Sequence, residues 1–403
     1  MSFRQYPTSD ATYDAYGTYI SPGKVALYRR LELGLVMGSR DGAIFTDAYD
    51  GTRFYNCHCN GGVFNLGHRN PRVLGAVRTA LDSFDIGNHH LVSGMRARLA
   101  ERLVATTGGA LSGVIFGVGG GEVIDLALKA ARGVTGRQKI VSAKGGYHGH
   151  TGLSVAAGDP EYRTPFGPNL PGFVQVPFDD IDALAGEIDS DTAAVLLEPV
   201  PATLGMPIAA DGYFASVAEL ARSRGALLVL DEVQTGLGRT GTMWCYQQLD
   251  AVPDILVTGK GLSGGIYPIS ATLMSPAVFS FFDELPFVHL STFGGAEPGC
   301  AAALAVLDIV ETPGFLTRVR ELGERFRSGL SDLPFNLRRR GMMMGLAFPA
   351  PDAAVMAAKM FLDAGIFAVW AENDRSVLQF LPPLILDDEQ VEDIIARVRS
   401  IFT

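Results

Sequence analysis

The sequence has few cysteines and no long apolar run. Four cysteines scattered among 403 residues cannot form a disulfide framework, which argues against a small secreted scaffold. No uninterrupted apolar run approaches the roughly 18 residues that a membrane-spanning helix requires. The opening of the chain is polar and aromatic and lacks the apolar core of a signal peptide. We therefore expect a cytoplasmic protein without a membrane segment.

Runs of positive charge are also lacking. The formal net charge is −10, so neither nucleic acid nor an anionic membrane is an expected partner. In contrast, a hydrophobic content of 47% is ample for a large core, and the length suggests two or three domains. The 48 glycines and 22 prolines occur without low-complexity tracts, which indicates many tight turns rather than disorder.

From about residue 96, short apolar runs alternate with amphipathic helical patterns. This alternation predicts an α/β fold with a mostly parallel central sheet covered by helices. After residue 296 the pattern changes to charged helices and short α+β elements. We expect an N-terminal segment at 1–55 that packs with the small domain, a large domain at 56–299, and a small C-terminal domain at 300–403. The expected strands lie at 112–118, 139–143, 193–200, 226–233, 254–260 and 269–274, and helices at 121–136 and 213–225.

The stretch ALLVLDEVQTGLGRTG, residues 226–241, ends an apolar strand in two carboxylates, Asp231 and Glu232. A buried charge is costly unless it has a partner, and ligands of open α/β sheets bind outside the carboxyl ends of strands. Glu198 and Lys260 follow other strand patterns in the same way. These residues are therefore candidates for a common site.

Lysines narrow the search because the chain has only six. Only Lys144 and Lys260 follow a strand pattern and precede a glycine. A lysine at a buried strand end has a lowered pKa and can act as a nucleophile. For either lysine taken alone, a side chain that simply reaches solvent is the simpler interpretation.

The stretch FGVGGGEVIDLALK, residues 116–129, runs from a strand through three glycines into a helix. Backbone N–H groups and the helix N-terminus could bind a phosphate there, although the stretch matches neither common nucleotide-binding motif. A simple helix cap explains the pattern equally well. Together, a phosphate cradle, a nucleophilic lysine and a carboxylate are the three groups that pyridoxal phosphate needs.

Over roughly residues 34–385 the chain resembles the class III pyridoxal-phosphate aminotransferases, the ω-, ornithine- or GABA-type enzymes of fold type I. The most specific match is DEVQTGLGRTG followed by a lysine 29 residues after its Asp231. The resemblance implies an enzyme that moves an amino group from an amine or amino acid to an oxo acceptor. The matching stretches are DGTRFYN, VFNLGHRNPRV, GGGEVIDLALKAARGVTGR, GGYHGHTG, VLLEPV, LLVLDEVQTGLGRTG, PDILVTGKGLSGG and STFGGAEPGCAAALAVL.

The resemblance also implies roles for individual residues. Lys260 would form a Schiff base with the cofactor, and Asp231 would pair with its ring nitrogen. Thr292 would reach the phosphate from the partner subunit of a homodimer with shared active sites, and Lys144 would be a bystander. The expected cofactor-binding residues are Gly120, Gly121, Tyr147, His148, Glu198, Asp231, Val233, Gln234, Lys260 and Thr292.

Two departures from the family pattern concern ligand binding. Gly119 stands where relatives have a serine whose hydroxyl contacts the phosphate, a hydrogen bond worth about 1.5–3 kcal/mol. Gln379, in LQFLPPL, stands where many relatives have an arginine that clamps a substrate α-carboxylate. Either Arg29, Arg30 or Arg375 substitutes for that arginine, or the substrate lacks the carboxylate.

Other interpretations remain at this point. A racemase, epimerase or aminomutase on the same fold is the alternative function, because the fold does not fix the reaction. The stretch NCHCN, residues 56–60, suggests a metal site, but two cysteines and a histidine do not supply four ligands at zinc-finger spacing. We expect buried cysteines and no metal there.

Overall fold

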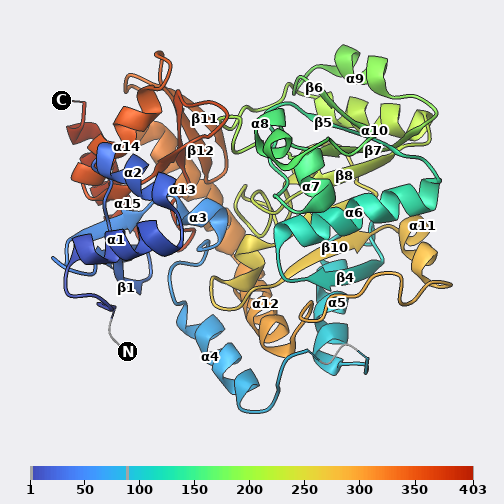
Figure 1. Ribbon diagram of the computed structural model, residues 1–403, viewed down its shortest axis with the longest axis horizontal. Coiled ribbons are helices and arrows are strands. Elements are labelled where there is room, and N and C mark those ends of the chain that lie inside the picture. The colour runs from blue at the N-terminus through green and yellow to red at the C-terminus, as the bar shows by residue number, and fades with distance from the viewer. Residues whose placement is uncertain (1–2, 88–89, 403) are drawn as a thin grey trace.

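The computed structural model describes residues 3–87 and 90–402 (Figure 1). A seven-stranded sheet occupies the right half of the view. Five of its strands, β5 to β9, are parallel, and β10 runs antiparallel to both of its neighbours. The predicted α/β architecture is thus confirmed. In spatial order the strands are β4 (Gly113–Gly117), β10 (Ser270–Met274), β9 (Ile255–Thr258), β8 (Leu227–Asp231), β7 (Thr192–Leu197), β5 (Lys139–Ala143) and β6 (Phe173–Val176).

Helices cover both faces of this sheet. On one face, α6 (Gly120–Thr135) packs in a cluster with Ala194 and Leu196 of β7. On the other face, Val195 and Leu197 of the same strand join a larger cluster. Successive side chains point to opposite faces of a strand, so a strand covered on both sides is apolar throughout. The second cluster includes residues of α4 (Pro71–Leu81), α5 (Gly94–Ala105), α9 (Ile181–Glu187), α10 (Tyr213–Ser223) and α12 (Glu297–Val310).

Most predicted element boundaries lie within one to three residues of those observed. The helix expected at 121–136 spans Gly120–Thr135, and Gly136 ends it with a left-handed φ of 68°, the usual role of glycine after a helix. The strand expected at 254–260 is shorter and ends at Thr258. A short 3₁₀ turn, η3 (Lys260–Ser263), begins at Lys260, so Lys260 lies beyond the strand.

The C-terminal part forms a second sheet with its own core. Helices α13 (Phe315–Leu330), α14 (Ala353–Asp363) and α15 (Asp388–Ser400) contribute to a separate apolar cluster with residues of this sheet. The short strand β13 (Ile366–Phe367) pairs instead with β3 of the N-terminal sheet. The second sheet has the order β11 (Asn336–Arg340), β12 (Met343–Ala347), β15 (Val377–Phe380) and β14 (Val369–Trp370).

The N-terminal segment lies beside these C-terminal elements, as the blue and red ribbons show in Figure 1. Its sheet has β13 as the fourth strand, and Leu27 and Leu31 pack against the C-terminal core. The predicted boundary at 299/300 falls inside α12, and the three-part division of the chain remains a prediction. The segment contains α1 (Ser9–Tyr19), α2 (Pro22–Arg30), β1 (Met37–Asp41), β2 (Ile44–Asp47) and β3 (Arg53–Asn56).

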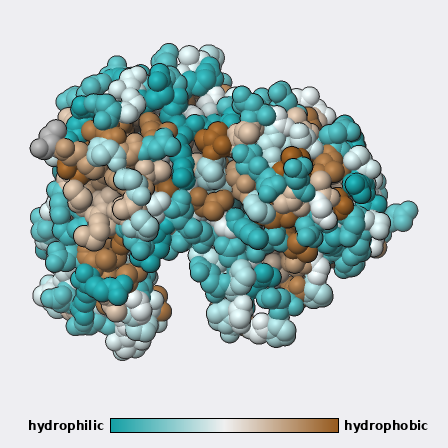
Figure 2. All heavy atoms as spheres, turned by 90° about the horizontal axis from the view of Figure 1, so that it is seen from above, coloured by the Kyte–Doolittle hydropathy of each residue, from teal (hydrophilic) through white to brown (hydrophobic). Residues whose placement is uncertain are grey.

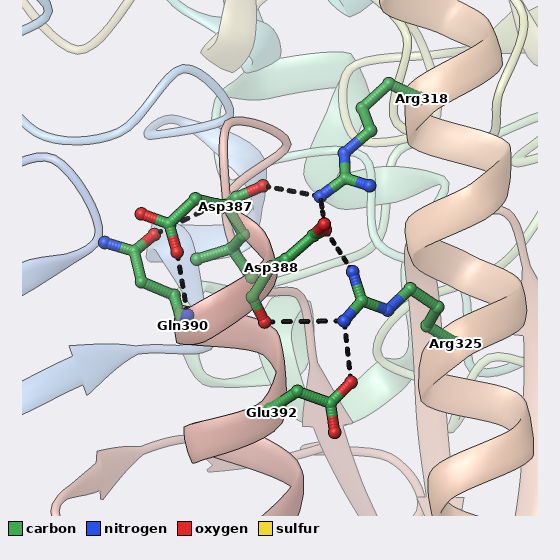
Figure 3. Close-up of polar contacts among 7 residues, drawn as sticks. Arg318, Arg325, Asp387, Asp388, Gln390 and Glu392 are labelled. Carbon is green, nitrogen blue, oxygen red and sulfur yellow. Dashed lines mark hydrogen bonds and ion pairs between the residues drawn. The ribbon is translucent and has the colours of Figure 1, made fainter.

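Ion pairs join α13 to the start of α15 (Figure 3). Arg318 and Arg325 both reach Asp388, and Arg325 also binds Glu392 at 2.6 Å. Asp387 accepts the backbone N–H of Gln390 at 2.8 Å, which completes a capping box. Carboxylates at a helix N-terminus are stabilised by the helix dipole, so these contacts fix where α15 begins.

Polar atoms cover much of the face shown in Figure 2, and apolar atoms form separate patches between them. Across residues 3–87 and 90–402, no single helix has both the length and the apolar composition needed to cross a membrane. Helices α12 and α13 meet that criterion only as a pair, and they are bent by 71° relative to each other.

A fully buried arginine ties the two parts together. Arg239, in the glycine-rich loop after β8, donates to Asn65 Oδ1 from Nε at 3.1 Å. Its Nη1 donates to the carbonyl oxygens of Met342 and Pro382 at 3.1 and 2.7 Å. Burial lowers the pKa of Arg239 to about 10, so the guanidinium stays charged near neutral pH. One side chain thus joins the loop to three distant chain segments.

We predict that replacing Arg239 with methionine destabilises the protein by about 3 kcal/mol or more. The substitution leaves three buried acceptors without a donor, each costing ~1–3 kcal/mol. Urea unfolding measures the change. Arg222→Met is the matched control, since Arg222 is exposed on α10 and pairs with Glu219 of the same helix, and it should alter stability little. Equal, small effects of both substitutions would contradict the role given to Arg239.

Candidate active site

Three candidate residues lie at the ends of adjacent strands. Glu198 follows β7, Asp231 ends β8, and Lys260 lies two residues beyond β9. Because these strands are parallel neighbours, their carboxyl ends meet at one edge of the sheet. Glu198 and Asp231 are each 5% exposed. The structure therefore gathers the two carboxylates and the lysine, as the sequence predicts.

Asp231 is held by a histidine and by its own loop. Its Oδ2 lies 2.9 Å from Nδ1 of His148, and its Oδ1 accepts the backbone N–H of Val233 at 3.0 Å. Burial alone would lower the pKa of His148, but the hydrogen bond and the charge of Asp231 outweigh burial and raise it. The imidazole therefore tends to keep its proton and to stabilise the Asp231 carboxylate.

The adjacent carboxylate, Glu232, has a different environment. It accepts the backbone N–H groups of Cys245 and Tyr246 at 2.6 and 2.7 Å, and the hydroxyl of Thr235 at 3.2 Å. Burial raises the pKa of Glu232 to about 7, although these donors oppose the rise. The two carboxylates of the motif thus have different partners. Asp231 contacts the imidazole of His148, whereas Glu232 binds the backbone of the segment at Cys245 and Tyr246.

Glu198 is buried beside Asp231. Its Oε1 accepts the backbone N–H of Tyr147 at 2.9 Å, and its Oε2 accepts that of Ala202 at 3.4 Å. Burial raises the pKa of Glu198 to about 7; the charge of His148 opposes the rise and that of Asp231 adds to it. Glu198 can therefore change its charge near neutral pH.

Of the two candidate lysines, Lys260 is half-buried and Lys144 is exposed. Burial lowers the pKa of Lys260, while the charges of Asp231 and Glu198 act in the opposite direction. Its φ of 41° is left-handed, a strained conformation for a residue with a side chain. With its amide turned to satisfy both atoms, Gln234 accepts from Lys260 Nζ at 3.0 Å and donates to Gly61 O at 3.3 Å.

The glycine turn lies where α6 begins. Gly119 caps the helix without a side-chain hydrogen bond, so the first N–H groups of the helix have no partner within it. A Cβ on Gly121 would stand 2.8 Å from Thr151 Oγ1, whereas one on Gly119 would meet open space. A cavity of about 350 Å³ adjoins the turn and is lined by Gly119, Gly120, Lys260 and Ser270, among others.

The other predicted residues occupy different surroundings. Tyr147 is half-buried, with its ring 5.0 Å from that of His150. The methyl groups of Val233 lie 3.6–3.9 Å from where a Cβ would stand on Gly120 or Gly259. Thr292 is exposed, and no hydrogen bond or ion pair among the described residues joins it to Lys260, Asp231 or Glu198.

Sequence reasoning missed a left-handed turn at Cys59–Gly62. All four residues have positive φ, from 50° at Cys59 and Asn60 to 96° at Gly62. A Cβ on Gly61 would lie 3.3 Å from Lys260 Cε, so the turn presses close against the lysine. The letters NGG, which favour left-handed backbone, were the available signal.

The cysteines of NCHCN lie beside this turn. Cys57 and Cys59 are fully buried free thiols. Cys59 N–H donates to Asn56 Oδ1 at 2.8 Å, and its thiol donates to the Asn56 carbonyl. Within residues 3–87 and 90–402, no group of three or more His, Cys, Asp or Glu side chains is placed to hold a metal ion.

Gln379 lies on β15 and is 6% exposed. Its Nε2 donates to Trp370 O at 3.3 Å. It pairs with Gly345 of β12, and directly paired residues share a face of the sheet. A Cβ on Gly345 would lie 3.2 Å from Met206 Cβ, so Gln379 lies on the face that packs against the segment after Glu198.

Two of the three arginines named as possible substitutes form ion pairs elsewhere. Arg29 binds Asp14 at 2.8 Å, and Arg375 binds Asp352 at 3.0 Å. Arg30 is exposed at the end of α2. Among the described residues, none of these arginines forms an ion pair with Glu198 or Asp231 that would place it where Gln379 replaces the expected arginine.

Comparison with known proteins supports one family. The family model described as class III aminotransferase matches residues 29–402. A relative named an uncharacterized aminotransferase, from Archaeoglobus fulgidus, is 48% identical over 387 residues, which cover 94% of this chain and 91% of the relative.

Solved structures of transaminases have the same fold. An ornithine aminotransferase from Toxoplasma gondii superposes with a TM-score of 0.89 at 25% identity, covering 99% of this chain and 96% of that one. A pyridoxal-phosphate-bound amine transaminase from an uncultivated Pseudomonas species gives a TM-score of 0.82 at 26% identity, covering 91% and 94%.

All four cysteines are buried, which predicts slow reaction with thiol reagents. Burial raises the pKa of Cys59 to about 12 and that of Cys300 to about 12, so the reactive thiolate is scarce at neutral pH. We expect Ellman's reagent to modify less than about one thiol per chain before urea is added, and all four afterwards.

A positive control comes from Ser223→Cys, which places a thiol on the exposed last residue of α10. This variant should gain one rapidly reacting thiol. Rapid modification of Cys57 or Cys59 in the native protein would show that the NCHCN segment opens to solvent and would contradict their buried placement.

Proposed function

The chain belongs to the class III aminotransferases, and we propose that Lys260, Asp231 and Glu198 are the centre at which it exchanges amino groups. The observation that carries this proposal is the convergence, at adjacent strand ends, of a half-buried lysine whose pKa is lowered by burial and a buried carboxylate. In open α/β sheets, ligands bind outside the carboxyl ends of the strands, and a lysine with a nearby aspartate is the pair that pyridoxal-phosphate chemistry uses.

Membership of the family implies pyridoxal phosphate, and the residues around Lys260 fit that cofactor. An amine whose pKa is lowered is ready to bind an aldehyde. Asp231 offers a buried carboxylate to a protonated ring nitrogen. The open N–H groups of Gly120 and Gly121 at the start of α6 suit a phosphate. Val233, packed between Gly120 and Gly259, would support one face of the ring, and Tyr147 would cover the other.

The proposed mechanism assigns each side chain one task. When bound, pyridoxal phosphate supplies an aldehyde that exchanges amines and a ring that accepts the electron pair of a broken C–H bond. Lys260 Nζ acts as the base that removes the proton from the amine-bearing carbon of the donor. Asp231, held by His148, keeps its negative charge toward the ring nitrogen. Gln234 positions Lys260 Nζ through its amide oxygen.

We also propose a homodimer in which Thr292 of one subunit completes the phosphate site of the other. Thr292 is exposed, and so are Phe287, Leu290 and Phe293 around it. An apolar segment of this kind gains stability from coverage by another chain. The glycine at 119 makes such a contribution more important, because it removes a side-chain donor from the cradle.

The donor is proposed to be a primary amine that does not depend on an α-carboxylate. Gln379 cannot form the two charged hydrogen bonds of an arginine clamp. Among the described residues, no arginine lies within ion-pair distance of Glu198 or Asp231. A carboxylate brought to this site would lose water and meet two negative charges, which is unfavourable.

The assignment of Lys260 predicts that Lys260→Ala lowers the rate of amino transfer by about a thousandfold or more, since it removes both the cofactor link and the base. Lys144→Ala, which changes an exposed lysine, should keep normal activity. Borohydride reduction of the loaded protein, followed by peptide mass analysis, should find the cofactor on Lys260. Labelling of another lysine, or an active Lys260→Ala protein, would refute the assignment.

The role given to Gln379 predicts a change of substrate preference. Gln379→Arg should raise kcat/KM for α-amino acids relative to the matching amines by about tenfold or more, since a charged clamp is worth about 1.5–3 kcal/mol. Gln379→Met, similar in volume, should not produce this change. The measurement is kcat/KM for paired donors with and without the carboxylate. An unchanged ratio in Gln379→Arg would place substrate recognition elsewhere.

A further inference from the structure

Gly146 lies in the loop between β5 and α7 (Gly152–Ala156), beside the buried acids. Its backbone does not have the positive φ that favours glycine. A Cβ there would instead meet three polar atoms: Ala143 O at 3.2 Å, His148 Nε2 at 3.4 Å and Glu198 Oε1 at 3.6 Å. The missing side chain therefore leaves a small space bounded by polar groups.

One of those polar atoms needs a partner. His148 is 3% exposed, and its Nε2 has no hydrogen-bond partner among the described residues. An unsatisfied buried polar atom costs ~1–3 kcal/mol. Ala143 O already accepts from Gly146 N and Gln175 Nε2. The two remaining atoms at the space, His148 Nε2 and Glu198 Oε1, are a donor and an acceptor that one water molecule could join.

We propose that Gly146 leaves a single-water site that links Glu198 to His148, and through His148 to Asp231, so that the three side chains share protons as one network. This rests on the proposed function only in taking Asp231 as the cofactor's partner and Glu198 as a substrate-side group. His148 is then a positioning residue that also couples Glu198 to Asp231. A change in the charge of Glu198 alters how strongly His148 holds its protons, and so alters the environment of the Asp231 carboxylate.

The proton balance of the network is simple. The Nδ1 proton stays on His148 and is donated to Asp231 Oδ2, which is 2.9 Å away. When Glu198 is protonated, its carboxyl proton belongs to Glu198 and faces the water. When Glu198 ionises, that proton is released to solvent, and the new negative charge favours a proton on His148 Nε2, which is taken from solvent and donated to the water.

Other charged groups also act on this network. Lys260 affects Glu198 and is itself affected by both carboxylates, and Tyr147 senses both. These groups would shift a titration, but the three atoms nearest to a Cβ on Gly146, outside its chain neighbours, belong to Ala143, His148 and Glu198. Filling that space is therefore a selective way to break the link, while the contact of His148 with Asp231 remains.

The test follows the imidazole nitrogens of His148 by NMR, in protein labelled with ¹⁵N-histidine and loaded with pyridoxal phosphate. The chain has seven histidines, and His148→Asn identifies the relevant signals by their loss. In the unmodified protein, we expect the Nε2 signal of His148 to shift with a midpoint near pH 7, following the pKa of Glu198, which burial raises to about 7.

Three substitutions separate the possible causes. Glu198→Gln should abolish the shift because it removes the titrating group. Gly146→Ala should reduce its amplitude by about half or more, because a methyl group displaces the water. Gly75→Ala, which adds a methyl group to open space on α4, is the matched control and should leave the shift unchanged.

Either of two results overturns the proposal: no response of His148 near pH 7, or an equal response in Gly146→Ala and the unmodified protein. The same titration in cofactor-free protein separates this proposal from the proposed function. If borohydride labels a lysine other than Lys260, the proposed function fails, but the response of His148 in the cofactor-free protein still decides whether the network exists.

Discussion

The structure depends on keeping two carboxylates and one amine buried at one edge of a sheet. Each charge would be costly in isolation, and each is made tolerable by a different neighbour. Asp231 has the imidazole of His148, Glu198 has two backbone N–H groups, and Lys260 has both carboxylates around it. Burial also shifts the pKa values of these groups. It lowers the pKa of Lys260 and raises that of Glu198 to about 7, so that Glu198 can exchange a proton near neutral pH.

The surroundings of the site hold the lysine in a strained conformation. Lys260 has a left-handed φ, and the left-handed turn at Cys59–Gly62 lies against it. Strain of this kind persists only where the surroundings determine it. Arg239 provides part of that constraint, because it binds Asn65, three residues beyond the turn, and two carbonyl groups of the C-terminal part. The loop that begins with Asp231 thus also fixes the chain opposite Lys260, which explains how a single motif can serve both the site and the fold.

Sequence reasoning predicted what depends on local pattern and missed what depends on folding. Apolar strands that alternate with helices predicted the sheet, and the strand ends predicted that Asp231, Glu198 and Lys260 would meet. The choice between Lys144 and Lys260 rested on resemblance until burial separated them. The contact between His148 and Asp231 joins residues 83 positions apart, and no local signal announces it. The space at Gly146 is even harder to predict from the sequence, because nothing distinguishes this glycine, which has ordinary backbone angles, from a glycine in a simple loop.

The charge around the site bears on which substrates it can accept. In the proposed site, a charged Lys260 would offset Asp231 and Glu198. With pyridoxal phosphate bound, its protonated ring nitrogen would offset Asp231, and Glu198 would depend on a proton or on the substrate. An arginine at position 379 would supply a positive charge for a carboxylate, but Gln379 is neutral and donates to Trp370 O. A donor without negative charge would leave this balance unchanged. The neutral side chain at 379 and the raised pKa of Glu198 therefore both favour the donor proposed above, although they come from different parts of the fold.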